Sequence, residues 1–120
     1  MPGRFCVSLT RAKDDTDRAT VAFVVANAAV ASDKEAIVFL SIEGVRLSIQ
    51  GAAEGVHEPG FKPLAELMGD FTKAGGKILV CSPCFKKRSL DETKLVPGAA
   101  IVGGAKLVEF LGAGAPAISY

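Results

Sequence analysis

Two cysteines lie three positions apart in the segment Cys81-Ser82-Pro83-Cys84. The apolar residues 77–81 predict a buried strand that ends at the motif, and Pro83 fits the first turn of a short helix over residues 83–88. Residues at positions i and i+3 of a helix are neighbours, so the two thiols are expected to lie close together. One thiol would act as a nucleophile, and the other would attack the mixed disulfide, persulfide or sulfenic acid formed on it.

The surroundings of the motif favour Cys81 as the nucleophile. In parallel sheets, chemistry collects at the carboxyl ends of strands, and Cys81 is expected at such an end, just before a helix. The amino terminus of that helix and its three cationic side chains would stabilise a thiolate. We therefore predict a lowered pKa for Cys81, with Cys84 as the resolving thiol. The supporting residues are Ser82, Lys86, Lys87 and Arg88.

Three cysteines do not make a disulfide framework, and each can instead be an ordinary buried thiol. This is our interpretation of Cys6, which lies in the first apolar run. A zinc site is an alternative for the pair, but Cys-x-x-Cys supplies only half of a tetrahedral site, and the soft ligands left are His57 and Cys6. We expect no metal and no other cofactor, with a zinc site between subunits as the alternative. His57, in a glycine-rich loop beside Glu58, is a weak candidate for a general base.

The elements that must position the motif alternate along the chain. Strands are predicted at residues 4–10, 35–41, 77–81 and 99–102, with a last strand or tail at 115–119. Helices are predicted at 16–32, 62–74, 83–88 and 104–111, and a short one at 44–49 within the glycine-rich segment 42–60. Thr16 or Asp17 would cap the first helix. The alternation predicts one α/β domain over residues 1–120, with a mostly parallel five-stranded sheet flanked by helices in three layers.

The same alternation weighs against a thioredoxin, in which a Cys-x-Pro-Cys motif also follows a strand and opens a helix. Here three predicted strands and two helices precede the motif. No antiparallel hairpin with the proline that faces a thioredoxin site is predicted after it.

The helix predicted at residues 16–32 is apolar almost all round, with Thr20 and Asn27 as nearly its only polar residues beyond the first turn. Such a helix must be covered on every side, so we expect one side on the sheet and the other on a second subunit. The apolar content of 49% also favours a homo-oligomer, because a small domain has much surface to cover.

Charge and hydropathy exclude several partners. The 14 Lys and Arg residues balance 13 Asp and Glu residues, and no basic stripe occurs, so we expect no nucleic acid partner. The longest apolar stretch, residues 21–31, is about half of the roughly 20 residues that span a membrane. The first residues lack the pattern of a secretory signal. We therefore expect a cytoplasmic protein with no membrane partner.

Several segments together resemble the DsrE/DsrF-like family, in matching order over nearly the whole chain. They are Ala26-Asn27-Ala28-Ala29, Ile37-Val38-Phe39-Leu40, Glu43-Gly44-Val45-Arg46-Leu47, the run from Gly75 to Cys81, the run from Pro97 to Val102, and Leu107-Val108-Glu109-Phe110-Leu111. The resemblance implies a parallel sheet flanked by helices with a flavodoxin-like topology, and a trimer or hexamer. In sulfur-relay members a cysteine after the third strand carries a persulfide, and Cys81 aligns with it. Cys84 is additional to that pattern.

We therefore hypothesise a cysteine-dependent sulfur carrier, similar to a sulfurtransferase, or a thiol-redox protein, with a sulfur donor or acceptor protein as its partner. Whether the protein is an enzyme depends on whether it catalyses sulfur transfer or thiol–disulfide exchange. The alternative is a non-catalytic oligomeric module that binds a small ligand between the loops at residues 10–15 and 44–57. Ligand binding of that kind would survive the loss of either cysteine.

Overall fold

The computed structural model describes residues 3–120 and contains one five-stranded sheet in which every strand pair is parallel. The strand order is β4-β3-β2-β1-β5. The strands are β1 (Arg4–Leu9), β2 (Glu35–Leu40), β3 (Lys77–Cys81), β4 (Ala99–Val102) and β5 (Ala117–Ser119). The helices are α1 (Thr16–Ala31), α2 (Leu64–Lys73), α3 (Ser82–Lys87) and α4 (Gly104–Gly112), with the 3-10 helices η1 (Ile42–Ser48) and η2 (Glu92–Lys94).

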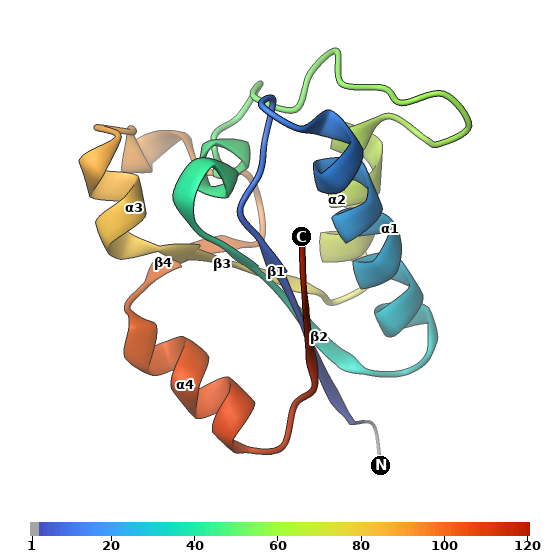
Figure 1. The fold of residues 1–120 in the computed structure, drawn as a ribbon, viewed down its shortest axis with the longest axis vertical. Helices are drawn as coiled ribbons and strands as arrows, with labels where there is room; N and C mark the ends of the chain where they lie inside the picture. The colour runs from blue at the N-terminus through green and yellow to red at the C-terminus, as the bar shows by residue number, and fades with distance from the viewer. Residues whose placement is uncertain (1–2) are drawn as a thin grey trace.

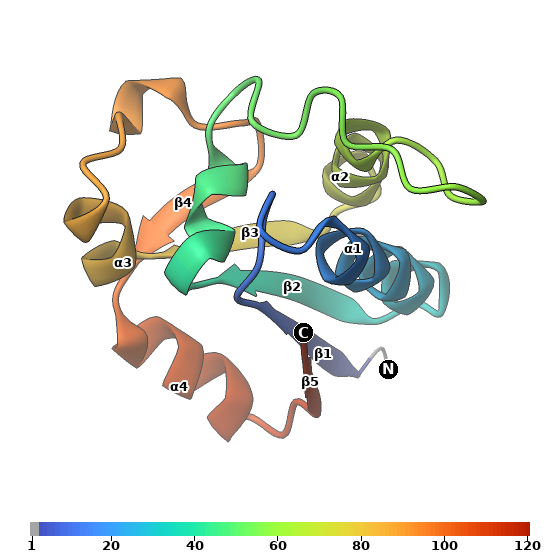
Figure 2. The ribbon, with the colours of Figure 1, turned by 45° about the horizontal axis from the view of Figure 1, so that its top comes forward.

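The elements form the predicted three layers (Figures 1 and 2). Helices α1 and α2 lie side by side on one face of the sheet, and α4 lies on the opposite face. The larger apolar core fills the space between the sheet, α1, α2 and η1. The smaller core lies under α4 and consists of Cys6, Ile37, Phe39, Leu79 and Phe110.

The register aligns the carboxyl ends of the central strands. Leu9 of β1 pairs with Leu40 of β2, and Leu40 pairs with Val80 of β3. The loop after β1, helix η1 after β2 and helix α3 after β3 therefore start along one edge of the sheet. This edge is where side chains from distant parts of the chain can meet.

Helix α1 is covered by more of its own chain than the sequence predicts. Phe23 is fully buried and packs edge-to-face on Phe71 of α2, with ring centroids 6.0 Å apart. The side-chain amide of Asn27 donates to the backbone oxygens of Phe23 and Leu67 and so links the two helices. The sheet therefore covers one side of α1, and α2 covers another. Val21, Val24 and Val25 stay half-buried on this helix.

Helix boundaries differ from the prediction by one or two residues. The residue that caps α1 is Asp15, not Thr16 or Asp17, because its carboxylate accepts from the backbone N–H of Arg18. Helix α3 begins at Ser82, one residue before Pro83, and η1 begins at Ile42, two residues before the predicted start at Gly44. Strands β3 and β4 have the predicted bounds. Within residues 3–120, no helix has the length and apolar character needed to cross a membrane.

Candidate active site at the carboxyl edge of the sheet

Cys81 and Cys84 lie where β3 passes into α3. Cys81 is the last residue of β3 and the residue before the first turn of α3, and Cys84 lies within that turn. Both side chains are half-buried, and neither forms a disulfide. The two thiols are near enough for each to shift the pKa of the other. The two thiols are therefore neighbours, as the sequence predicts.

The environment of Cys84 lowers the pKa of its thiol. The largest cause is the backbone N–H of Ile42, which is directed at the Cys84 sulfur and favours the thiolate. The Cys81 thiol and the charges of Arg88 and Lys87 act in the same direction, whereas partial burial opposes them. Of the three predicted cations, Lys87 and Arg88 thus act on Cys84, and Arg88 acts on Cys81 as well.

The environment of Cys81 raises the pKa of its thiol, so the predicted lowering is wrong. Burial is the largest cause, and the neighbouring Cys84 thiol adds to it. The backbone N–H of Cys84 and the charge of Arg88 offset only part of this rise. Helix α3 is only six residues long, so its dipole is weaker than a full helix would supply.

The backbone N–H of Ile42 belongs to the turn that follows β2. Ile42 has φ of 56°, an outlier for a β-branched residue, and its side chain is 52% exposed. The turn is anchored by hydrogen bonds from the Ser41 N–H to the Leu9 oxygen and from the Gly44 N–H to the Ser41 oxygen. Gly44 packs so closely on β1 that a Cβ there would lie 2.2 Å from the Leu9 oxygen. The backbone conformation at Ile42 is therefore set by its neighbours in the chain, not by packing of its own side chain.

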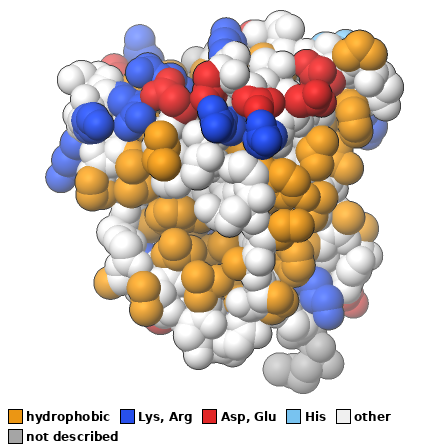
Figure 3. Space-filling view, in the orientation of Figure 1, with side chains coloured by type: hydrophobic (Ala, Val, Ile, Leu, Met, Phe, Trp, Pro, Cys, Tyr) orange, Lys and Arg blue, Asp and Glu red, His pale blue; other side chains and the backbone are white. Residues whose placement is uncertain are grey.

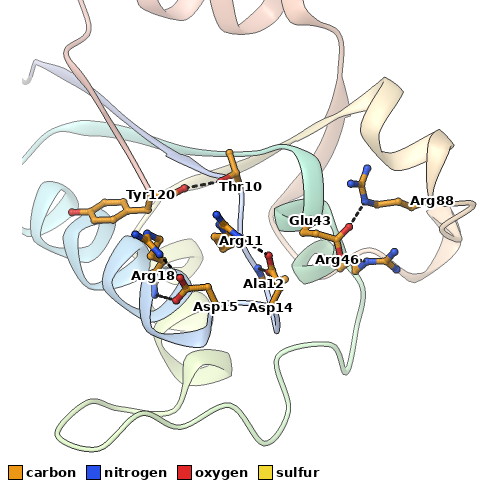
Figure 4. A network of polar contacts seen from close by, with 10 residues as sticks. All are labelled: Thr10, Arg11, Ala12, Asp14, Asp15, Arg18, Glu43, Arg46, Arg88 and Tyr120. Carbon is orange, nitrogen blue, oxygen red and sulfur yellow. Dashed lines mark hydrogen bonds and ion pairs between the residues drawn. The ribbon is translucent and has the colours of Figure 1, made fainter.

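Arg88 connects this turn to α3. Its Nε donates to Glu43 Oε2 at 2.7 Å, and its Nη1 donates to the backbone oxygen of Cys84 at 3.2 Å. Glu43 also accepts from Arg46, and the two guanidinium groups, Arg88 first, hold the pKa of its carboxyl below its usual value. Figure 4 shows this cluster beside the loop that carries Arg11, Asp14 and Asp15. Arg88 is thus a structural link as well as a charge, and the half-buried Ser82 and exposed Lys86 have no side-chain hydrogen bond among the described residues.

His57 and Cys6 lie apart from the cysteine pair. The His57 Nε2 is 2.7 Å from the backbone oxygen of Phe61, and the side chain lines a hollow shared with Lys13, Thr16 and Glu58 near the start of α1. The loop at residues 55–62 lies on the side of α1 and α2, away from α3 (Figures 1 and 2). Cys6 is in the core under α4, and burial raises the pKa of its thiol to about 11.

Metal ligands do not gather at this edge. Among residues 3–120, no three side chains of the types His, Cys, Asp and Glu lie close enough together to hold a metal ion. The chemistry that the arrangement can perform is that of two neighbouring thiols of different acidity.

Two features of the site had no clear signal in the sequence. The Ile42 N–H is a backbone group that every non-proline residue carries, so residue type could not indicate it. The pair of Glu43 and Arg88 joins positions 45 residues apart. The nearest signal in the sequence was that Glu43 lies in a segment that resembles the DsrE/DsrF-like family.

The fold and the site together define a small parallel α/β protein with two neighbouring thiols at the end of a central strand. The model of the DsrE/DsrF-like family matches residues 3–120, and the chain belongs to this family. The uncharacterized protein MJ0760 of Methanocaldococcus jannaschii is 28% identical over 102 residues, which are 85% of this chain and 37% of that protein. The chain therefore spans little more than a third of the length of this relative.

Solved structures share the fold. The crystal structure of the ychN protein from E. coli superimposes with a TM-score of 0.77 at 17% identity, covering 98% of this chain and 99% of that one. MTH1491 from Methanobacterium thermoautotrophicum, a protein of unknown function, gives a TM-score of 0.78 at 16% identity with the same coverage. At these identities the two structures establish the fold alone.

Proposed function

We propose that the protein is a cysteine-dependent sulfur carrier or thiol-redox protein whose working groups are Cys81 and Cys84. The observation that carries this proposal is the placement of two free cysteines at the junction of β3 and α3, where one thiol has a raised and the other a lowered pKa. A thiolate beside a protonated thiol suits the acceptance of sulfur followed by thiol exchange. Membership of the DsrE/DsrF-like family, which includes sulfur-relay proteins, supports the same function.

Treatment with glutathione persulfide, followed by intact-protein mass spectrometry, tests this function. We expect the wild-type protein and Cys6→Ser to react at one site, giving an added sulfur atom or an oxidised cysteine pair. The double variant Cys81→Ser/Cys84→Ser should do neither, because the remaining Cys6 is buried and its pKa is about 11. Equal reaction of the double variant and the wild type would contradict the proposal, as would the absence of any reaction in the wild type.

A second candidate, binding of a small ligand, is favoured by a hollow between the two loops expected to bind it. This hollow of about 250 Å³ is lined by Ala12 and Lys13 of the first loop, by Leu90, and by four residues of the second loop. Those four are Arg46, Leu47, Ile49 and Ala52. Two cations at an apolar hollow suit a small anion with an apolar part. Binding there would persist in the double cysteine variant, which separates the two functions.

We also propose that the protein self-associates through the apolar surface of α4 and β5. Val108 of α4 is 69% exposed and Ile118 of β5 is 41% exposed, and β5 is an edge strand with a free side. Figure 3 shows charged side chains gathered in a band at the upper end of the molecule, with an extended apolar area below it. An apolar area of this kind suits contact with a second copy.

Light scattering after size-exclusion chromatography tests this assembly. The wild type is expected at a multiple of the monomer mass, and Val108→Glu is expected to shift toward the monomer because it places a charge in the contact. Phe61→Glu, at a loop residue that is 37% exposed, is the matched control and should keep the wild-type mass. A wild type that stays monomeric at all concentrations would rule out self-association.

A further inference from the structure

We propose that a cavity beside α2 binds a small uncharged apolar molecule, such as a single substituted aromatic ring. The cavity has a volume of about 260 Å³ and lies between α2, the segment that follows η1 and the segment that leads into β4. None of its lining residues belongs to the segment 81–88, and it shares only Leu47 and Ile49 with the hollow that carries Lys13 and Arg46. The inference therefore does not depend on the proposed sulfur or redox function.

The inner wall of the cavity is apolar and belongs to the larger core. Leu47, Met68 and Ile78 line it, and all three are buried. The charged residues that line it are Glu54 and Lys73, and both are exposed, so they lie at its mouth. Their charges are opposite, so the mouth has no net charge that would select a charged ligand.

The polar groups around the cavity already have partners within the protein. The Thr72 hydroxyl donates to the Gly69 oxygen at 3.2 Å, and the Val96 N–H donates to the Ser48 oxygen at 2.8 Å. Among residues 3–120, the one buried side-chain polar atom without a partner is the Thr20 hydroxyl, and Thr20 does not line this cavity. A buried water needs roughly two to four polar partners, so this cavity suits an apolar molecule better than water.

The cavity is open because α2 has a glycine on the side that faces it. Gly69 lies between Ala65 and Lys73, which are one turn before and one turn after it, and all three residues line the cavity. A Cβ at Gly69 would meet nothing within 4 Å. Glycine destabilises the interior of a helix relative to alanine, so Gly69 weakens α2 while leaving this space empty.

The size and place of the cavity favour a small molecule over a second copy of the chain. Apolar cavities of about 150 Å³ already bind benzene, so the larger volume here accommodates a ring with a substituent. The mouth carries the charges of Glu54 and Lys73 and lies on the side of the sheet that α2 covers. The apolar surface proposed for self-association lies instead on α4 and β5.

Titration with toluene, followed by two-dimensional NMR of the ¹⁵N-labelled protein, tests this site. We expect saturable shifts in the backbone signals of Gly69 and Ile78, which line the cavity, and little shift in the signal of Cys84. Saturating toluene should also raise the Tm, because it binds the folded protein. Benzoate and benzylamine resemble toluene in size but should bind at least about tenfold more weakly, because no buried group compensates their charge.

Variants that fill the cavity locate the bound toluene. Gly69→Leu should weaken toluene binding at least about tenfold, because the added side chain occupies the space. Ala65→Leu fills the cavity from a neighbouring position and should weaken binding in the same way. Ala74→Leu is the matched control, because it adds the same side chain at an exposed residue at the end of α2 that does not line the cavity. It should bind toluene as the wild type does, and so should Cys81→Ser/Cys84→Ser.

The outcomes decide both the site and the class of ligand. A wild type without saturable shifts would overturn the proposal, and so would equal toluene binding by the wild type and the two filled variants. If benzoate or benzylamine binds more tightly than toluene, the ligand class is wrong. Loss of binding in Gly69→Leu and Ala65→Leu, with binding retained in Ala74→Leu, supports the cavity as the site.

Discussion

Replacing Phe71 by alanine is expected to lower the free energy of unfolding by about 3–5 kcal/mol. Phe71 of α2 is fully buried, and its ring packs edge-to-face on Phe23 of α1 at a centroid distance of 6.0 Å. It thus contributes to the contact that joins the two helices on this face of the sheet. Deleting the ring removes apolar burial and leaves a cavity between elements that cannot close over it.

Urea unfolding followed by circular dichroism measures this loss. Phe61→Ala is the matched control, because Phe61 lies in a loop and is 37% exposed, and its loss should change stability by no more than about 0.5 kcal/mol. Equal effects of the two variants would contradict the importance of the Phe71 contact.

A glycine at the edge of the Phe71 ring makes the prediction sharper. A Cβ at Gly76 would lie 2.3 Å from the Phe71 ring, so Gly76→Ala alone should destabilise the protein. In the double variant Phe71→Ala/Gly76→Ala the added methyl occupies space that the ring has vacated. The double variant should therefore be more stable than the sum of the single effects predicts, which a double-mutant cycle measures.

The fold follows from patterns that are local in the sequence. The five apolar residues 36–40 indicate a strand buried on both faces. In the structure they lie in β2, the central strand of the sheet. Gly75 and Gly76 end α2 and fix the start of β3, so Lys77–Cys81 has the predicted bounds. Because such strands alternate with helices, only a few sheet topologies are compatible with the sequence.

The chemistry of the site was predicted less well because it depends on contacts between distant segments. Which residues would come together could be predicted, since Cys81, Cys84 and Arg88 lie in one short stretch. The direction of the pKa shift at Cys81 could not, because it depends on how deeply the end of β3 is buried. The N–H that lowers the pKa of Cys84 comes from Ile42, and its position depends on a backbone conformation that an isoleucine rarely adopts.

The packing around α1 could likewise be predicted only in part from the sequence. Its apolar circumference correctly indicates that it must be buried on more than one side. The sequence does not say whether the second cover is another subunit or another helix of the same chain, and α2 takes part of that role. The apolar surface left for a partner is the surface of α4 and β5, where Val108 and Ile118 are exposed.

Gly44→Ala is expected to damage both stability and the thiol site. Its Cβ would lie 2.2 Å from the backbone oxygen of Leu9 and 3.0 Å from the backbone carbon of the same residue. A backbone oxygen at the end of a central strand cannot rotate away as a flexible side chain can. The turn must therefore move, at a cost of about 1–3 kcal/mol, and Ile42 must move with it.

Displacing the turn should withdraw the Ile42 N–H from Cys84 and raise the pKa of that thiol. In a Cys81→Ser background, Gly44→Ala should therefore move the alkylation profile of Cys84 to higher pH. Gly69→Ala is the matched control, since a Cβ there meets nothing within 4 Å. Because Gly69 lies within α2, this change should stabilise the protein by up to about 1 kcal/mol and leave Cys84 unaffected.

The two readouts of Gly44→Ala separate the structural role of the turn from its chemical role. A folded variant with lower stability and a shifted Cys84 profile would tie the thiolate to the Ile42 N–H. Lower stability with an unchanged profile would mean that Arg88 and Lys87 hold the thiolate without the turn. In that case the left-handed conformation of Ile42 would follow only from the close packing of Gly44 on β1.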